Sequence, residues 1–252
     1  MRRLSRALVL ALAALVAVPA LSAAGPRSSV EGGPGAGAGV APPGRDGGAT
    51  IARILAPTVA RPAPGSRRGG IPISPGTAWT QEPTALLVLE ATDRDGEEWL
   101  RVLLPTRPDG SSGWVPRERV QLERTPYWIE VHLDARTVDV YRSGSLVRDA
   151  HAVVGAPATP TPTGLAAIYE SVRQADPHRF DGAWVLPLTT LSKALRHFEG
   201  GPGRIGIHGR AGASLADPLG SARSHGCVRV PNAFVTWLGG HVPLGTPVLI
   251  QE

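Results

Sequence analysis

Residues 224–232 read SHGCVRVPN, and residues 207–209 read IHG. The longer stretch contains Cys227, the only cysteine of the chain, and has His225 two positions before it. A thiolate is a strong nucleophile, and an imidazole that takes the thiol proton, or an imidazolium that stabilises the thiolate, favours its formation. These residue types in this order predict acyl transfer through a thioester on the cysteine.

Either histidine, His208 or His225, is a candidate base for Cys227. In an extended segment, side chains two positions apart point to the same side, so we expect His225 and Arg229 to lie on the side of the thiol. The backbone N–H groups of Gly226 and Cys227 lie on a glycine-containing turn, where we expect them to face a developing oxyanion. Arg229 is a candidate for holding a substrate carboxylate through two hydrogen bonds.

Other interpretations of the same residues are open. Cys227 taken alone is ordinary as a small, inert core residue. A zinc site built from His208, His225 and Cys227 is a second alternative, but a structural zinc site usually has four ligands, and the sequence offers no evident fourth one. The combination of these residue types in one chain favours catalysis, and we expect no metal and no cofactor.

Several short elements of the second half resemble the signature of the L,D-transpeptidase catalytic domain family. The matching elements are His208-Gly209, Ser224-His225-Gly226-Cys227-Val228-Arg229, Asn232 and the upstream Pro162-Thr163-Gly164. The resemblance runs from about Trp128 to Gln251 and implies a β-rich catalytic fold.

The resemblance also implies roles for the matched residues. Cys227 corresponds to the nucleophile, and His208 to the base, whose ring is oriented by the backbone carbonyl of Gly209. The remaining motif residues line the pocket or place the substrate. We therefore predict the catalytic residues Cys227, His208 and His225, and the substrate-binding or oxyanion residues Ser224, Gly226, Arg229, Gly209 and Asn232.

In the implied reaction, Cys227 attacks the carbonyl of the third residue of a peptidoglycan tetrapeptide stem and expels the terminal D-alanine. An amine of a neighbouring stem then attacks the thioester, which gives a three-to-three cross-link. Water as the acceptor would make the protein an L,D-carboxypeptidase, and a catalytically silent wall-binding protein is the other alternative. The expected partners are donor and acceptor stems, and carbapenems are expected inhibitors because their strained carbonyl can acylate the same thiolate.

The N-terminal residues predict export. Residues 1–24 have basic residues, an apolar run to about Val18 and then small residues, which is the order of a secretory signal peptide. We expect an exported protein of the periplasm or cell wall with no transmembrane anchor after cleavage, and an uncleaved anchor is the alternative. Residues 25–49 are rich in Gly, Pro and Ala and predict a flexible linker.

Residues 50–122 predict a small SH3-like β domain. Short apolar runs between turn signals indicate strands, at 51–54, 86–89, 99–104 and 113–115. The segments 98–102 and 113–115 resemble bacterial SH3-like domains, and an unrelated β-meander is the alternative.

Residues 127–252 predict the β-rich catalytic domain. Alternating residues at 129–133 and 138–141 indicate half-buried strands, and the turn signal at 142–145 before Leu146-Val147 indicates a hairpin. Further strands are expected at 152–155 and 247–250. Residues 176–181 read as a polar loop. Two short helices are expected, at 191–198 and 233–238. The predicted fold class is therefore mainly β, with a small SH3-like β-barrel followed by a β-rich L,D-transpeptidase catalytic domain that has a few short helices.

Charge excludes one class of partner. The formal net charge is +5, with 26 Lys and Arg against 21 Asp and Glu, and the excess includes three arginines of the first six residues. No basic cluster with interleaved aromatic residues is present, so we expect no nucleic-acid partner.

Overall fold

The computed structural model of the chain describes residues 40–198 and 200–252. The predicted signal peptide and most of the predicted linker lie outside the described residues. The described residues belong to one compact unit that extends to Glu252. No helix among them has the length and apolar character needed to cross a membrane.

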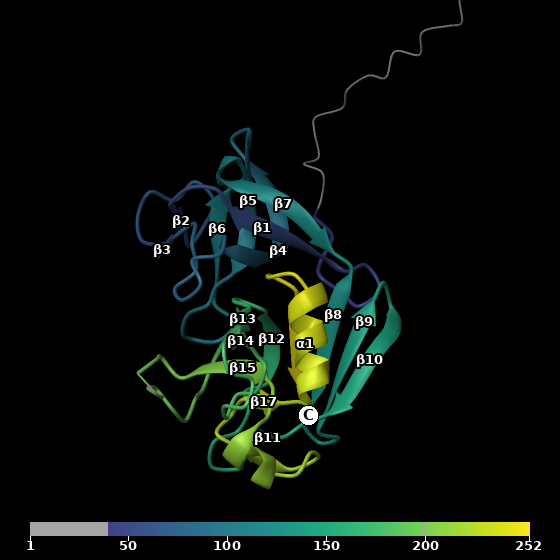
Figure 1. Cartoon of the computed structure of the whole chain (residues 1–252). Helices are drawn as coiled ribbons and strands as arrows, with labels where there is room; N and C mark the ends of the chain where they lie inside the picture. Colours follow the sequence, from purple (N-terminus) through teal and green to yellow (C-terminus); the bar gives the residue numbers. More distant parts are fainter. Residues whose placement is uncertain (1–39, 199) are drawn as a thin grey trace, which may run out of the picture. The chain divides into compact units, whose positions relative to one another are not determined.

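Five antiparallel strands form the first sheet, in the order β6-β5-β4-β1-β7 (Figure 1). They are β1 (Ala49–Ile54), β4 (Ala85–Arg94), β5 (Glu97–Leu103), β6 (Ser112–Pro116) and β7 (Val120–Thr125). A separate pair, β2 (Thr58–Ala60) and β3 (Ile71–Ile73), and the 3-10 helix η1 (Arg117–Arg119) complete this half. The strands predicted here are confirmed. Among the described residues no pairing joins β6 to β7, so the SH3-like barrel is not confirmed.

The second half contains a mixed five-stranded sheet in the order β10-β9-β8-β18-β12. Its members are β8 (Tyr127–His132), β9 (Thr137–Arg142), β10 (Ser145–His151), β12 (Gly164–Ala167) and β18 (Pro247–Gln251). The predicted hairpin is confirmed. Arg142 and Ser145 pair across a two-residue turn in which Ser143 and Gly144 both have positive φ, which suits the right-handed twist of the flanking strands.

A four-stranded sheet, in the order β13-β14-β15-β17, carries the sequence motif of the second half. Its strands are β13 (Val172–Arg173), β14 (Trp184–Leu191), β15 (Arg204–His208) and β17 (Val228–Arg229), and a further parallel pair is formed by β11 (Val154–Gly155) and β16 (Ala222–Ser224). The 3-10 helix η2 (Gly212–Ala216) lies between β15 and β16 in the sequence.

One α-helix, α1 (Asn232–His241), is present in the described residues. It begins directly after Pro231 and buries Phe234, Val235 and Leu238 against the core of the second half. The helix predicted at 233–238 is therefore confirmed and is longer than predicted. The described part of the second half is thus mainly β with a single short α-helix.

The helix predicted at 191–198 is wrong. Leu191 is the last residue of β14, and the residues after it form bends without a helix. The hydroxyl of Ser192 accepts a hydrogen bond from the backbone N–H of Leu195, and its own backbone N–H donates to the carbonyl of Gly203. These local bonds replace the hydrogen bonds that a helix would make.

The predicted strand at 152–155 is also shorter than expected. The strand β11 contains only Val154 and Gly155, while Val153 forms an isolated antiparallel bridge in which it exchanges two backbone hydrogen bonds with Arg229 of β17. This exchange ties the strand segment to β17, beside the motif that contains the cysteine.

Candidate active site

Two neighbouring parallel strands bring distant parts of the motif together. Ile207 of β15 pairs with Val228 of β17, and His208 pairs with Arg229. Ile207 and Val228 are fully buried in the core, so the alternation of side chains puts His208 and Arg229 on the other face of this sheet. Cys227 directly precedes β17, and its Sγ lies 4.0 Å from the carbonyl oxygen of Arg204, the first residue of β15.

A tight turn from Ser224 to Cys227 presents the thiol. The hydroxyl of Ser224 accepts a hydrogen bond from the N–H of Gly226 at 3.0 Å and donates one to the carbonyl of Cys227 at 2.6 Å. Gly226 has a φ of 116°, and a Cβ at this position would lie 2.9 Å from Cδ1 of Ile205. The turn therefore requires glycine here.

The bend at Gly226 changes what was expected of His225. The backbone bends at His225 and Gly226 and is not extended there. The alternation of side chains in an extended strand therefore does not apply to His225 and Cys227. His225 is exposed, and its ring centroid lies 5.7 Å from that of Phe198. The N–H of Gly226 already donates to Ser224, so an oxyanion at this turn would depend on other donors.

The hydroxyl groups of two threonines form hydrogen bonds with the backbone of this turn. The hydroxyl of Thr161 accepts a hydrogen bond from the N–H of Gly155 at 2.9 Å and donates one to the carbonyl of Gly226 at 2.8 Å. The hydroxyl of Thr159 donates to the carbonyl of Ser224 at 3.1 Å. The proline-rich loop next to the Pro162-Thr163-Gly164 element thus holds the backbone on both sides of His225.

His208 is buried, with 4% of its surface exposed, and its ring has a defined orientation. Its Nδ1 lies 2.8 Å from the carbonyl oxygen of Gly209 and 3.6 Å from Oδ1 of Asp181. A carbonyl only accepts hydrogen bonds, so Nδ1 carries the proton and Nε2 of the neutral ring is the basic nitrogen.

The surroundings of His208 contain groups that lower its pKa and groups that raise it. Burial lowers its pKa from the ordinary value of 6.5, and the nearby carboxylate of Asp181 opposes this change. The cationic Arg229 lowers the pKa further. A neutral, proton-accepting imidazole is therefore favoured near pH 7.

Arg229 is buried and ion-paired. Its Nη1 donates to Oδ2 of Asp217 at 2.7 Å, and its guanidinium lies 4.7 Å above the ring of Phe180. The same ring is 6.4 Å from the ring of His208. Nε of Arg229 is buried and has no hydrogen-bond partner among the described residues. A substrate carboxylate would therefore meet an arginine that Asp217 already neutralises in part.

Asn232 and Gly209 position the loops around the histidine. Oδ1 of Asn232 accepts hydrogen bonds from the N–H groups of Ala183 and Arg210, both at 3.1 Å, and its Nδ2 donates to the carbonyl of Arg210 at 3.0 Å. A Cβ at Gly209 would overlap with Oδ1 of Asn232. Both predicted substrate-binding residues thus join loops within the protein.

A cavity of about 350 Å³ lies next to residues that contact Cys227 and His225, although no predicted site residue lines it. Its lining residues are Trp79, Phe198, Gly200, Gly201, Pro202, Gly203 and Arg204. The carbonyl of Arg204 contacts Sγ of Cys227, and the ring of Phe198 lies against His225. This cavity is therefore the candidate substrate pocket.

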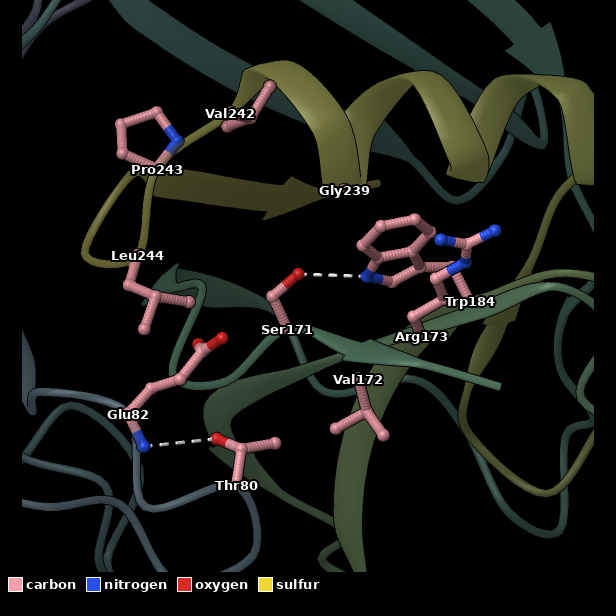
Figure 2. A pocket seen from close by; sticks show the side chains of 10 residues that line it. All are labelled: Thr80, Glu82, Ser171, Val172, Arg173, Trp184, Gly239, Val242, Pro243 and Leu244. Atoms are coloured by element: carbon pink, nitrogen blue, oxygen red, sulfur yellow. Dashed lines mark hydrogen bonds between the residues drawn. The ribbon is translucent and has the colours of Figure 1, made fainter. Parts of the chain in front are cut away.

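A second cavity, of about 470 Å³, lies near the end of α1 and is lined by none of the predicted site residues. Figure 2 shows the indole of Trp184 beside Gly239, with its Nε1 donating to the hydroxyl of Ser171 at 2.8 Å. A Cβ at Gly239 would overlap with the indole, so this glycine lets the helix pack on the ring.

Several residues of the site were not identified from the sequence. They are Asp181 and Phe180 beside His208, Asp217 beside Arg229, and the hydroxyls of Thr159 and Thr161. Phe180 and Asp181 are the last two residues of the polar loop at 176–181, and this pair was the sequence signal that the loop belongs to the site. Nothing in the local sequence indicates Asp217. Within the residues that the structure describes, no group of three or more His, Cys, Asp or Glu side chains has an arrangement suited to a metal ion.

Comparison with known proteins identifies one family. The family model of the L,D-transpeptidase catalytic domain (YkuD) matches residues 126–250. The YkuD protein of Bacillus licheniformis is 38% identical over 125 residues, which are 50% of this chain and 66% of that protein. The YkuD protein of Bacillus subtilis strain 168 is 34% identical over 127 residues, which are 50% of this chain and 67% of that protein. The match thus spans about two thirds of the length of these relatives.

Solved structures of the same kind are also similar. The catalytic domain of the E. faecium L,D-transpeptidase is 24% identical, with a TM-score of 0.38, and the match covers 50% of this chain and 96% of that chain. The same catalytic domain acylated by ertapenem is 25% identical, with a TM-score of 0.37, and the match covers 51% of this chain and 99% of that chain. An L,D-transpeptidase from Mycobacterium tuberculosis H37Rv is 15% identical, with a TM-score of 0.43, and the match covers 79% of this chain and 95% of that chain.

Proposed function

Because residues 126–250 belong to the L,D-transpeptidase catalytic domain family, we propose that this chain is a cysteine-dependent peptidoglycan L,D-transpeptidase that forms three-to-three cross-links. The observation that carries the proposal is the parallel pairing of β15 with β17. In this pairing His208 lies beside Arg229 of β17, the strand that directly follows Cys227, and the ring of His208 is oriented by the carbonyl of Gly209.

The proposed first half-reaction acylates the enzyme. Nε2 of the neutral His208 takes the thiol proton of Cys227, and the sulfur attacks the carbonyl carbon of the third residue of a tetrapeptide stem. The bond from this carbon to the nitrogen of the terminal D-alanine breaks, and the leaving amine takes the proton from His208. The product is a thioester on Cys227 and free D-alanine.

The proposed second half-reaction transfers the acyl group. His208 accepts a proton from the amine of an acceptor stem, and the nitrogen attacks the thioester carbonyl. The C–S bond breaks, a new amide bond forms, and the thiol of Cys227 is restored by the proton that His208 holds. Because the thioester conserves the energy of the cleaved amide, the exchange needs no nucleotide.

The buried turn and the buried histidine support this assignment of roles. A base whose pKa is lowered by burial is neutral at the pH of the exterior, where it can accept a proton. Ser224, Thr159 and Thr161 hold the backbone around Cys227, so the thiol has a fixed position relative to β15.

Intact-protein mass spectrometry tests the proposal. Wild type and Cys227→Ala are each incubated with a disaccharide-tetrapeptide, and the expected result is an acyl adduct and a dimeric product with wild type only. Tripeptide without dimer would establish the L,D-carboxypeptidase instead. No adduct and no turnover by folded wild type would overturn the proposal and favour a silent wall-binding protein. Replacement of Leu55, which is 57% exposed and lies outside the motif, by Ala serves as a control that should retain activity.

We further propose an exported protein that acts in the periplasm or cell wall, with residues 1–24 as its signal peptide and residues 50–122 as an SH3-like domain. Its donor and acceptor would be peptidoglycan stems. Acylation of Cys227 by carbapenems follows from the same thiolate chemistry, and one L,D-transpeptidase catalytic domain of the family is known as its ertapenem adduct.

A further inference from the structure

An exposed tryptophan of the first half is held in place by a carboxylate of the second half. Trp79 lies between β3 and β4, and 53% of its surface is exposed. Oε1 of Glu170 accepts the backbone N–H groups of Trp79 at 2.9 Å and of Thr80 at 3.1 Å. Glu170 is completely buried. The backbone below this large exposed side chain is thus held by two hydrogen bonds to a buried carboxyl group.

The loop that carries Trp79 is also ordered by its own bonds. Thr77 is fully buried, and its backbone N–H donates to the carbonyl of Glu82 at 2.9 Å. The side chain of Gln81 donates to the carbonyl of Thr77 at 2.8 Å. The backbone that carries the indole is therefore held in place before any ligand arrives, which reduces the entropy that binding would cost.

The indole forms a wall of the cavity beside the thiol. On the other side the cavity has Phe198, the glycine-rich residues 200–203 and Arg204. Arg204, at one end of this glycine-rich segment, contacts Cys227 through its carbonyl oxygen. Phe198, at the other end, contacts the ring of His225.

Among the described residues that line the cavity, Arg204 is the one charged residue, and the others are aromatic residues, glycines and a proline. The guanidinium of Arg204 donates to the carbonyls of Leu188 and Pro105 and lies 4.8 Å from the ring centre of Tyr169, so its charge is directed away to other groups. Two aromatic rings and a stretch of glycine backbone suit peptide planes and small apolar side chains.

We propose that Trp79 is a substrate-binding residue that completes the pocket of Cys227 by contacting an uncharged, small-residue segment of the peptide that acylates this thiol. The inference rests on the proposed function, because it takes the acyl donor to be a stem peptide. The first half of the chain therefore supplies part of the binding site for the chemistry of the second half.

Binding and turnover are measured separately to test this role. A disaccharide-tetrapeptide is titrated by calorimetry into Cys227→Ala, and into the same protein with Trp79→Ala, Trp79→Phe or Leu55→Ala added. Leu55 is the matched control, since it is 57% exposed in the same half and lines none of the cavities described above. We expect Trp79→Ala to weaken binding by about five- to tenfold, the loss of one aromatic contact, Trp79→Phe to recover part of it, and Leu55→Ala to change nothing.

Alkylation of Cys227 by iodoacetamide in Trp79→Ala distinguishes a lost contact from a distorted site, and we expect its rate to be that of wild type. Equal peptide affinity of Trp79→Ala and its parent, a loss of the same size in Leu55→Ala, or no measurable binding to Cys227→Ala would each overturn the inference. If binding depends on Trp79 but wild type forms no acyl-enzyme, the proposed function fails and the binding role of Trp79 stands.

Discussion

At the scale of single residues, the pKa of His208 is set by burial, which lowers it, and by Asp181, which raises it. His208 must be neutral to take the proton of Cys227, so the acylation rate should fall as the pH drops through this pKa. Replacing Asp181 by Asn removes a cause that raises the pKa, so the pKa falls further. We expect the acidic limb of the rate profile of Asp181→Asn to move to lower pH.

The measurement is the rate of carbapenem acylation of Cys227 against pH, followed by mass spectrometry. Asp176→Asn is the matched control, because this aspartate lies in the same loop, accepts a hydrogen bond from the backbone of His178 and is not among the groups that shift the pKa of His208. A limb that stays in place, or moves to higher pH, in Asp181→Asn would contradict the assigned effect of this carboxylate.

Gly226 gives a second prediction at the residue scale. An alanine here would adopt a φ of 116° and would place its Cβ 2.9 Å from Ile205. We expect Gly226→Ala to lose about 1–3 kcal/mol of folding free energy and most of its acylation rate, because the turn that presents Cys227 must shift. Thermal melts and adduct formation are the two readouts.

Gly220 provides the control for this change. It also has a positive φ, of 82°, but a Cβ there would meet no atom within 4 Å. Gly220→Ala should therefore lose stability from backbone strain while retaining acylation. If Gly226→Ala acylated at the wild-type rate, the turn would not position the thiol as described.

At the scale of elements, the proline-rich loop from 159 to 163 supports the turn after β16. Thr161 alone joins the N–H of Gly155 to the carbonyl of Gly226. Thr161→Val keeps the shape but leaves both buried backbone groups without this partner, at a cost of about 1–3 kcal/mol. We expect a lower Tm and slower acylation, and Thr161→Ser should restore both. A melt of Thr161→Val like that of the exposed-site variant Thr163→Val would contradict this role.

The elements also show what the sequence could predict. Strands β8 and β9 follow from alternation, and the hairpin of β9 and β10 follows from the Ser143-Gly144 turn, and both are local signals. The segment after Leu191 has apolar residues at helical spacing, yet Ser192 uses its hydroxyl and its backbone on other partners. A periodic pattern does not reveal such competing bonds.

The site was predictable to the extent that its residues share a motif. Cys227, Ser224 and Arg229 lie close in sequence, and the resemblance pointed to His208. The partners Asp181 and Asp217 come from separate loops and reach His208 and Arg229 only in the fold, where the parallel pairing of β15 with β17 sets these two residues side by side. Such pairing joins residues through a crossover, for which the sequence has no local signal.

At the scale of the whole molecule, the two halves share a core. Leu103 of β5 and Leu87 of β4 pack with Ala167 of β12, next to Leu165. The hydroxyls of Thr125 and Thr246 form a buried hydrogen bond, and Arg107 donates to the carbonyls of Ser192 and Pro202. Shared apolar contacts and hydrogen bonds of this kind couple the stability of two halves.

This coupling predicts a single unfolding transition that Leu103→Ala shifts as a whole. The truncation removes buried contacts at the shared core and should cost about 2–5 kcal/mol, which is a Tm decrease of about 5–15 °C for a chain of this size. Differential scanning calorimetry and hydrogen exchange of β8 and β15 are the readouts, since amides of the second half should lose protection although the substitution is in the first.

Leu100→Ala is the comparison, because Leu100 lies in the core of the first sheet itself. If the halves unfold together, both variants shift the same transition and lower protection in both halves. Two transitions, of which only the first moves in Leu103→Ala, would instead make the segments 50–122 and 127–252 independent domains. In that case the shared core would not hold the first half against the second half. The hydrogen bonds from the backbone of Trp79 to Glu170 would then be the contacts that keep Trp79 near the thiol.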